Sequence, residues 1–198
     1  MLHSLGAPED ILTSAKPHIG TDILRRVVEN AAERLTELGG EIRYHTALTE
    51  LPMRSGEVGR IMTDGGEIEC GAVVLAVGHS ARDTYSMIMR RGYEVVPKAF
   101  SMGLRIEHLR EDIDRSLYGD DAGHPLLPPA EYAMSRHYGE RTAYTFCMCP
   151  GGEVVAASSE EGLLAVNGMS RYARDGRNSN SAVLVSIAAS DTPDGQIE

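Results

Sequence analysis

The sequence is poor in aromatic residues and in cysteine, and each shortage excludes a class of protein. Trp is absent and Phe occurs twice among 198 residues, and no cluster of Lys or Arg accompanies the eight Tyr. Base-stacking platforms and basic tracks for nucleic acid need those residues. Three cysteines are an odd number and do not fit a secreted disulfide framework. With a net charge of -10, we expect no nucleic-acid partner and reduced thiols.

Long hydrophobic runs are also missing. No apolar stretch approaches the roughly 20 residues that cross a bilayer, and the N-terminus lacks the basic and apolar segments of a secretory signal. A hydrophobic content of 42% with 24% charged residues is typical of a globular protein with a buried core. We expect a cytoplasmic protein with no membrane partner.

Periodic apolar residues predict the local elements of the first half. Steps of three and four residues predict a helix over 22–38, which Thr21 or Asp22 can cap and Gly39-Gly40 can end. Two short extended segments follow at 41–44 and 47–53. A hairpin is predicted where 58–63 and 67–70 flank a turn at Asp64-Gly65-Gly66.

An uninterrupted apolar run at 72–77, half of it β-branched valine, ends in Gly78 and predicts a strand covered on both faces in a parallel sheet. A helix is predicted over 83–91, ended by Gly92. After Pro97 apolar residues alternate, as in a half-buried strand, so we place a domain boundary near Val96. Glycine and proline predict a loop over 119–130, and later apolar segments lie at 144–148, 154–157 and 182–187.

Several longer motifs carry a family resemblance. They are KPHIGTD at 16–22, GHSARDT at 78–84, FCMCPGG at 146–152, GLRIEH at 103–108, NGMS at 167–170 and NSNS at 178–181. In their order along the chain they resemble those of the uncharacterised bacterial FAD-dependent dehydrogenases, which are flavoproteins with two dinucleotide-binding domains. The resemblance extends over nearly the whole chain.

This resemblance implies a fold and an activity. The fold is α/β, with a partial Rossmann-like FAD-binding domain (FAD/NAD(P)-binding type) over 1–96 and part of a β-rich substrate domain over 97–198. The activity is that of an FAD-dependent oxidoreductase, a dehydrogenase that moves two electrons between a small-molecule substrate and FAD, with NAD(P)H as a further electron partner. It leaves the substrate, the direction of electron transfer and the oligomeric state open.

The resemblance also names residues that contact the cofactor. The strand that ends at Gly78 would bring Gly78, His79, Ser80 and Arg82 to the flavin, and Leu48 would be a backbone contact at the adenine edge. From pattern alone, a buried strand followed by an ordinary turn explains this segment equally well.

Lys16, His18 and Asp22 place a cation, an imidazole and a carboxylate around Gly20. Such a set can steady a flavin, bind an anion or move a proton, so Lys16 and His18 are candidate catalytic residues. The alternative is helix capping by Asp22, with Lys16 and His18 facing solvent.

Cys147 and Cys149 are separated by one residue and precede a Pro-Gly-Gly loop, so both thiols can face one side of a strand end. They are candidate catalytic residues beside a flavin. A buried structural pair and a metal site are the alternatives, and without a second cysteine pair we expect no metal.

Asn167 and Asn180 are candidate cofactor contacts within a polar stretch that also holds Asn178, Arg171 and Arg174. Their amides and guanidinium groups can bind a carboxylate or a flavin carbonyl. Turn formation is the alternative. Glu107 and His108 are weaker candidates for a charge pair.

Two other kinds of function remain open. One is a non-catalytic nucleotide-binding module, and the other is a thiol redox or metal protein centred on Cys147 and Cys149.

The chain lacks the Gly-x-Gly-x-x-Gly turn that holds the FAD pyrophosphate and the C-terminal glycine-rich FAD segment of this family. We therefore expect an internal fragment that alone binds FAD poorly or not at all. Flavin-fluorescence titration of the purified chain should show no saturable quenching, and tight stoichiometric binding would contradict this expectation.

Overall fold

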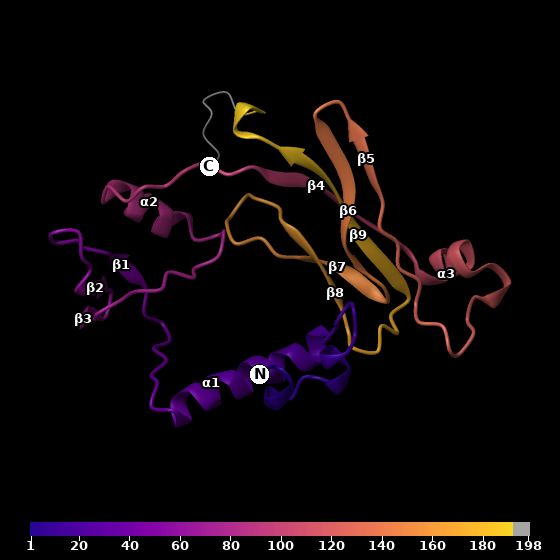
Figure 1. Ribbon diagram of the computed structural model, residues 1–198, viewed down its shortest axis with the longest axis horizontal. Coiled ribbons are helices and arrows are strands. Elements are labelled where there is room, and N and C mark those ends of the chain that lie inside the picture. Colours follow the sequence, from indigo (N-terminus) through magenta and orange to yellow (C-terminus); the bar gives the residue numbers. More distant parts are fainter. Residues whose placement is uncertain (192–198) are drawn as a thin grey trace. The chain divides into compact units, whose positions relative to one another are not determined.

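The structure is a computed structural model that describes residues 1–191. Its internal contacts divide the chain into two units. The first unit combines Met1–Gly40 with the chain from Lys98 onward, and the second is Glu41–Pro97. Helices and strands occur in both, which confirms a mixed α/β fold (Figure 1). The assignment of 1–96 and 97–198 to an FAD domain and a substrate domain stays a prediction.

A four-stranded antiparallel sheet forms the body of the first unit (Figure 1). Its order is β4-β9-β6-β5, with bounds Phe100–Leu109 (β4), Asn178–Ile187 (β9), Arg141–Cys149 (β6) and Ser135–Tyr138 (β5). β4 and β9 stay in register from Phe100 opposite Ile187 to Leu109 opposite Asn178. The predicted β-rich character of this part of the chain is therefore confirmed.

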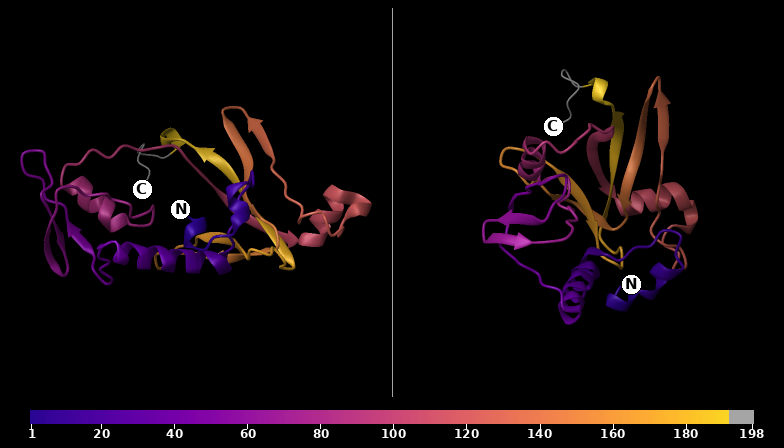
Figure 2. Two further views of the ribbon diagram at one scale, coloured as in Figure 1. Left: turned by 60° about the horizontal axis from the view of Figure 1, so that its bottom comes forward. Right: turned by 60° about the vertical axis from the view of Figure 1, so that its left-hand side comes forward.

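A second antiparallel pair, β7 (Gly152–Ala156) and β8 (Val166–Ser170), lies against this sheet (Figure 2). The Glu107 carboxylate of β4 connects the two layers, because it accepts hydrogen bonds of 2.7 Å from the Val154 backbone N–H and from Asn178 Nδ2. Glu107 thus joins β4, β7 and β9 and does not pair with His108.

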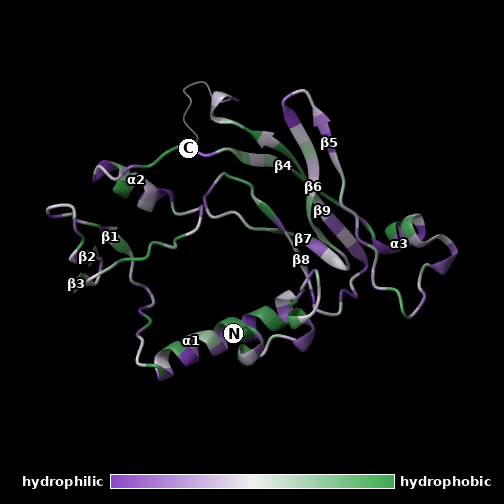
Figure 3. Ribbon diagram, viewed as in Figure 1, coloured by the Kyte–Doolittle hydropathy of each residue, from purple (hydrophilic) through white to green (hydrophobic). Residues whose placement is uncertain are grey.

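Helix α1 (Thr21–Glu37) confirms the longest predicted helix. It buries Val27, which is 2% exposed, and Gly39 ends it at a φ of 87°. Figure 3 shows hydrophilic and hydrophobic residues alternating along it. The predicted cap is wrong: Gly20 is the N-cap residue, and no side chain caps the helix. The Asp22 carboxylate accepts from the backbone of Tyr172 instead.

Shorter elements complete the described part of the first unit. They are the 3-10 helices η1 (His3–Leu5), η2 (Glu9–Leu12), η3 (Gly119–Asp121) and η4 (Ala189–Asp191), and the helix α3 (Arg110–Tyr118). Apart from η3, residues 119–130 form the predicted loop.

The second unit holds a three-stranded sheet in the order β1-β2-β3 and the helix α2. The bounds are Leu48–Glu50 (β1), Arg60–Thr63 (β2), Gly66–Glu69 (β3) and Arg82–Arg90 (α2). β2 and β3 are the predicted hairpin, and α2 is the predicted second helix. The extended segment expected at 41–44 is wrong, because it forms no strand.

The strand predicted at 72–77 is not formed in this structure. A central strand of a parallel sheet needs a hydrogen-bonded neighbour on each side. Among residues 1–191 no strand pairs with this segment, and Val74 is 91% exposed. The segment has the composition of a buried strand without the sheet that would bury it.

Much apolar surface of the described chain is exposed. The accessible surface is 14595 Å², against about 9,000 Å² for a typical folded chain of this size. On one face of β4, Met102 is 60% and Leu104 is 78% exposed. Within residues 1–191, no helix combines the length and the apolar character that crossing a membrane requires.

The contrast between two neighbouring valines of α1 tests the buried contact of this helix. Val27→Ala should lower the free energy of unfolding by about 1–2 kcal/mol, because it removes two buried methyl groups. Val28 is 61% exposed, so Val28→Ala makes the same change in solvent and should cost less than about 0.5 kcal/mol. Urea unfolding followed by circular dichroism measures both, and equal losses would contradict the packing of α1.

Candidate functional site

A pocket of about 370 Å³ in the first unit gathers the candidate catalytic residues. Lys16 and His18 come from the segment before α1, and Cys147 and Cys149 come from the end of β6. Glu131, Tyr132, Ser170 and Arg174 line it as well. Residues more than 120 positions apart in the sequence thus share one wall, because the segment before α1 docks on the chain that follows β8.

Backbone and side-chain hydrogen bonds hold this segment in place. His18 Nε2 donates to the Arg171 carbonyl at 2.9 Å, and Thr21 Oγ1 donates to the Ser170 carbonyl at 3.2 Å. Gly20 has a φ of 82° and lies so close to Tyr172 that a Cβ atom would collide with its backbone. The motif at 16–22 is therefore a joint between α1 and the end of β8.

The Asp22 carboxylate completes the joint. Its Oδ1 atom accepts a hydrogen bond of 2.9 Å from the Tyr172 backbone N–H. This bond is the main reason that the pKa of Asp22 lies below its ordinary value. The side chain is accordingly ionised at neutral pH.

Glu131 connects two cations at the pocket. Its carboxylate oxygens lie 3.2 Å from Lys16 Nζ and 2.6 Å from Arg174 Nη1. Two positive groups share one negative group, so this wall carries a net positive charge in a chain whose net charge is -10. The wall suits a small anion. Sequence reasoning missed Glu131, because only its distant partners reveal its role.

A β-bulge shapes the end of β6. Phe146 pairs with Ala182 and Cys149 with Asn180, so β6 holds one more residue than β9 between these pairs. Cys147 takes a positive φ of 48°, which is rare for residues other than glycine. Such a conformation costs roughly 1–3 kcal/mol and persists where surrounding contacts hold it.

Arg105 supplies those contacts. Its Nη1 atom donates to the Cys147 carbonyl at 3.1 Å and to Asn180 Oδ1 at 2.6 Å. Gly168 of β8 lies over this pair, and a Cβ atom there would collide with both Asn180 Oδ1 and Arg105 Nη1. The motifs GLRIEH, NGMS and NSNS therefore meet at one point.

Sequence reasoning also missed Arg105. The apolar alternation at 100, 102, 104 and 106 places Arg105 and Glu107 on the opposite face of β4. The motif GLRIEH and the polar pair on that face are the signals that could have indicated it.

The two thiols occupy different environments in the bulge. Cys147 is exposed, whereas Cys149 is half-buried with its Sγ atom 3.4 Å from the Cys147 carbonyl oxygen. Burial raises the pKa of the Cys149 thiol, and the neighbouring Cys147 thiol raises it further. Arg105 Nη1, 4.0 Å from Cys149 Sγ, opposes both effects.

Tyr132 and His108 form a polar contact beside the thiols. His108 Nε2 and the Tyr132 hydroxyl are 2.7 Å apart, and their rings are tilted with centroids 5.6 Å apart. Burial raises the pKa of Tyr132. The contact with His108 fixes the position of the Tyr132 hydroxyl in the pocket wall.

The predicted cofactor contacts are divided between the two units. Leu48 lies on β1, Gly78, His79 and Ser80 form an exposed turn before α2, and Arg82 is the first residue of α2. In the first unit, Asn167 is exposed on β8, and Asn180 is fully buried. Within the described chain, Asn180 Nδ2 has no hydrogen-bond partner. Cofactor contact by these residues stays a prediction.

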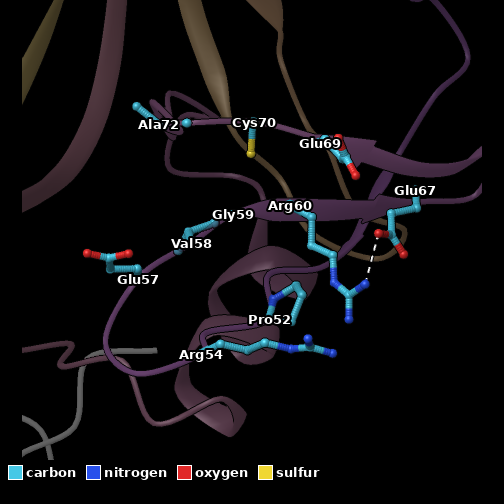
Figure 4. A pocket seen from close by; sticks show the side chains of 11 residues that line it. Pro52, Arg54, Glu57, Val58, Gly59, Arg60, Glu67, Glu69, Cys70 and Ala72 are labelled. Atoms are coloured by element: carbon cyan, nitrogen blue, oxygen red, sulfur yellow. Dashed lines mark hydrogen bonds and ion pairs between the residues drawn. The ribbon is translucent and has the colours of Figure 1, made fainter.

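A larger hollow of about 660 Å³ lies in the second unit, over the β2–β3 hairpin (Figure 4). Solvated charges dominate its wall, where Arg60 pairs with Glu67 at 2.9 Å and both side chains are more than a third exposed. Cys70 is its one thiol. None of the candidate catalytic or cofactor residues lines it, so the smaller pocket is the candidate site.

Across residues 1–191, no three His, Cys, Asp or Glu side chains form a group able to hold a metal ion.

Comparisons with known proteins show which family the chain resembles. Residues 99–198 match a protein family described as "FAD-dependent protein, C-terminal domain-like". An uncharacterised protein of Clostridium beijerinckii is 45% identical over 188 residues, which are 94% of this chain and 35% of that protein. The chain thus spans about a third of the length of this relative. The match includes the segment before α1 and the later residues that line the pocket.

The joint at Asp22 predicts a pH-dependent contribution to stability. Because the folded pKa lies below 3.8, the ionised carboxylate stabilises the fold above that pH and loses this effect as the pH falls through the folded pKa. Asp22→Ala should unfold more easily than wild type at pH 7, and the difference should shrink in acid. Urea unfolding at several pH values measures it.

Asp22→Asn is the matched control, because it keeps an oxygen that can accept from Tyr172 and removes the titration. It should retain most of the stability without the acid dependence. A wild-type advantage over Asp22→Ala that stays constant down to pH 2 would contradict the role of the carboxylate.

Proposed function

Because the chain belongs to the family of FAD-dependent proteins defined by this C-terminal domain, we propose that it is part of an FAD-dependent oxidoreductase that acts on a small organic molecule. The observation that supports the proposal most directly is the pocket. It combines a cation, an imidazole and two thiols on one wall, and the family match covers most of that wall. We assign this pocket to the substrate.

The pocket residues divide the work of binding and proton transfer. Lys16 and Arg174 attract an anionic group on the substrate, and Glu131 keeps them together. His18 donates from Nε2 to the Arg171 carbonyl, so Nδ1 is the acceptor nitrogen of the neutral ring. This fixes which nitrogen can hold a substrate proton.

FAD would supply two-electron chemistry, and NAD(P)H is the further electron partner that we propose. The turn at 78–80 fits contact with a cofactor. Gly78 has a φ of 75° and open space where a side chain would lie, and α2 begins without a side-chain cap. Backbone N–H groups at such a helix start suit phosphate or a flavin edge.

The unpaired segment 72–77 supports a Rossmann-like setting for that turn. Its residues favour a buried strand, and the described chain provides no partner for it. We propose that it pairs with a nucleotide-binding sheet outside this chain, which would also bury Val74.

The test uses the complete protein that contains this chain. It should bind FAD, and an anaerobic screen of small organic anions should find one that bleaches the oxidised-flavin absorbance. Lys16→Met should then raise the concentration needed for half-maximal bleaching by roughly two- to fivefold, as expected for one exposed ion pair. The amount of bound FAD should stay the same.

Lys98→Met is the matched control, because Lys98 is the other lysine of the chain and lies outside the pocket. Absence of FAD from the complete protein would refute the flavoprotein proposal. Bound FAD with equal effects of the two lysine substitutions would refute the assignment of the pocket to the substrate.

A further inference from the structure

The bulge at the end of β6 carries two thiols that differ in their exposure to solvent. Cys147 is exposed on the pocket, and Cys149 lies half-buried next to it. Both thiols line the same pocket, and Cys149 Sγ is 3.4 Å from the Cys147 carbonyl oxygen. Two neighbouring thiols on one pocket can exchange with one incoming disulfide.

The surroundings favour sulfur exchange at this point. Arg105 Nη1 is 4.0 Å from Cys149 Sγ and can stabilise a thiolate there. The nearby wall of Lys16, Arg174 and Glu131 carries a net positive charge. An anionic molecule that enters the pocket therefore meets the exposed thiol first.

We propose that Cys147 and Cys149 form a redox-active dithiol that reduces small anionic disulfides in this pocket. The Cys147 thiolate attacks one sulfur of the disulfide, forms a mixed disulfide and expels one thiolate, which takes up a proton. Cys149 then loses its proton to solvent and attacks Cys147 Sγ. An internal disulfide forms, and the second half of the substrate leaves as a thiol.

Atoms and electrons balance in this exchange. The two cysteines lose two electrons and two protons, and the small disulfide gains both. Burial raises the pKa of the Cys149 thiol and lowers its ionised fraction, whereas Cys147 is exposed on the pocket and is therefore the thiol that meets the disulfide first. This reaction concerns thiols alone, so it does not rest on flavin binding.

The experiment treats the reduced full chain with dithiodipropionate, an anionic disulfide, and maps the modified cysteines by peptide mass spectrometry after an acid quench. Wild type should form an internal disulfide between Cys147 and Cys149 and keep no adduct on either. Cys149→Ser should keep one mercaptopropionate on Cys147, because no resolving thiol remains. Cys147→Ser should react much more slowly, because the remaining thiol of the pair is half-buried.

Cys70→Ser is the matched control, because Cys70 lies in the second unit, and it should behave as wild type does. Cystamine, a cationic disulfide of similar size, should react roughly tenfold more slowly once each rate is divided by that of a neutral model thiol. This preference should weaken at high salt.

Two results would overturn the proposal. A stable adduct on wild type without an internal disulfide would show that Cys149 does not resolve the mixed disulfide. Equal normalised rates for the two probes would show that the pocket has no preference for anionic disulfides. Because no step uses flavin, either result leaves the proposed oxidoreductase to be decided by its own test.

Discussion

The guanidinium group of Arg105 is the contact on which the site depends. It reaches across the sheet from β4 to the Cys147 carbonyl of β6, and it also binds the buried amide of Asn180 on β9. The bulge places Cys147 in a left-handed conformation, and a charged donor to its carbonyl favours that conformation. Gly168 lets β8 lie over the same group. Residues of β4, β6, β8 and β9 therefore converge on one cation.

The second constraint is the joint before α1. Three side chains of this segment hydrogen-bond to the backbone at 170–172, namely those of His18, Thr21 and Asp22. These bonds bring Lys16 to Glu131, and Glu131 in turn holds Arg174. The residues that look catalytic in the sequence are partly structural, because the same contacts that build the joint also build the wall of the pocket.

Local elements were predictable from the sequence where short-range patterns determine them. The period of apolar residues indicated α1, and the Asp64-Gly65-Gly66 turn indicated the β2–β3 hairpin. The prediction of a strand at 72–77 was wrong because this element depends on long-range pairing. A central strand is defined by neighbours, and composition alone does not supply them. The predicted cap of α1 was wrong because the Asp22 carboxylate accepts a hydrogen bond from the backbone N–H of the distant Tyr172 instead.

The candidate site shows the same division. The sequence by itself determined the residue types and, through the motifs at 16–22 and 146–152, offered Lys16, His18, Cys147 and Cys149 as separate candidates, whereas the structure places all four on one pocket. Only the tertiary structure decided their relation to Arg105 and Glu131, which gives the wall its charge and the thiols their unequal burial. The physical reason is range. Helix periodicity and turn chemistry act over a few residues, whereas a β-bulge and shared ion pairs depend on chain segments that meet only after folding.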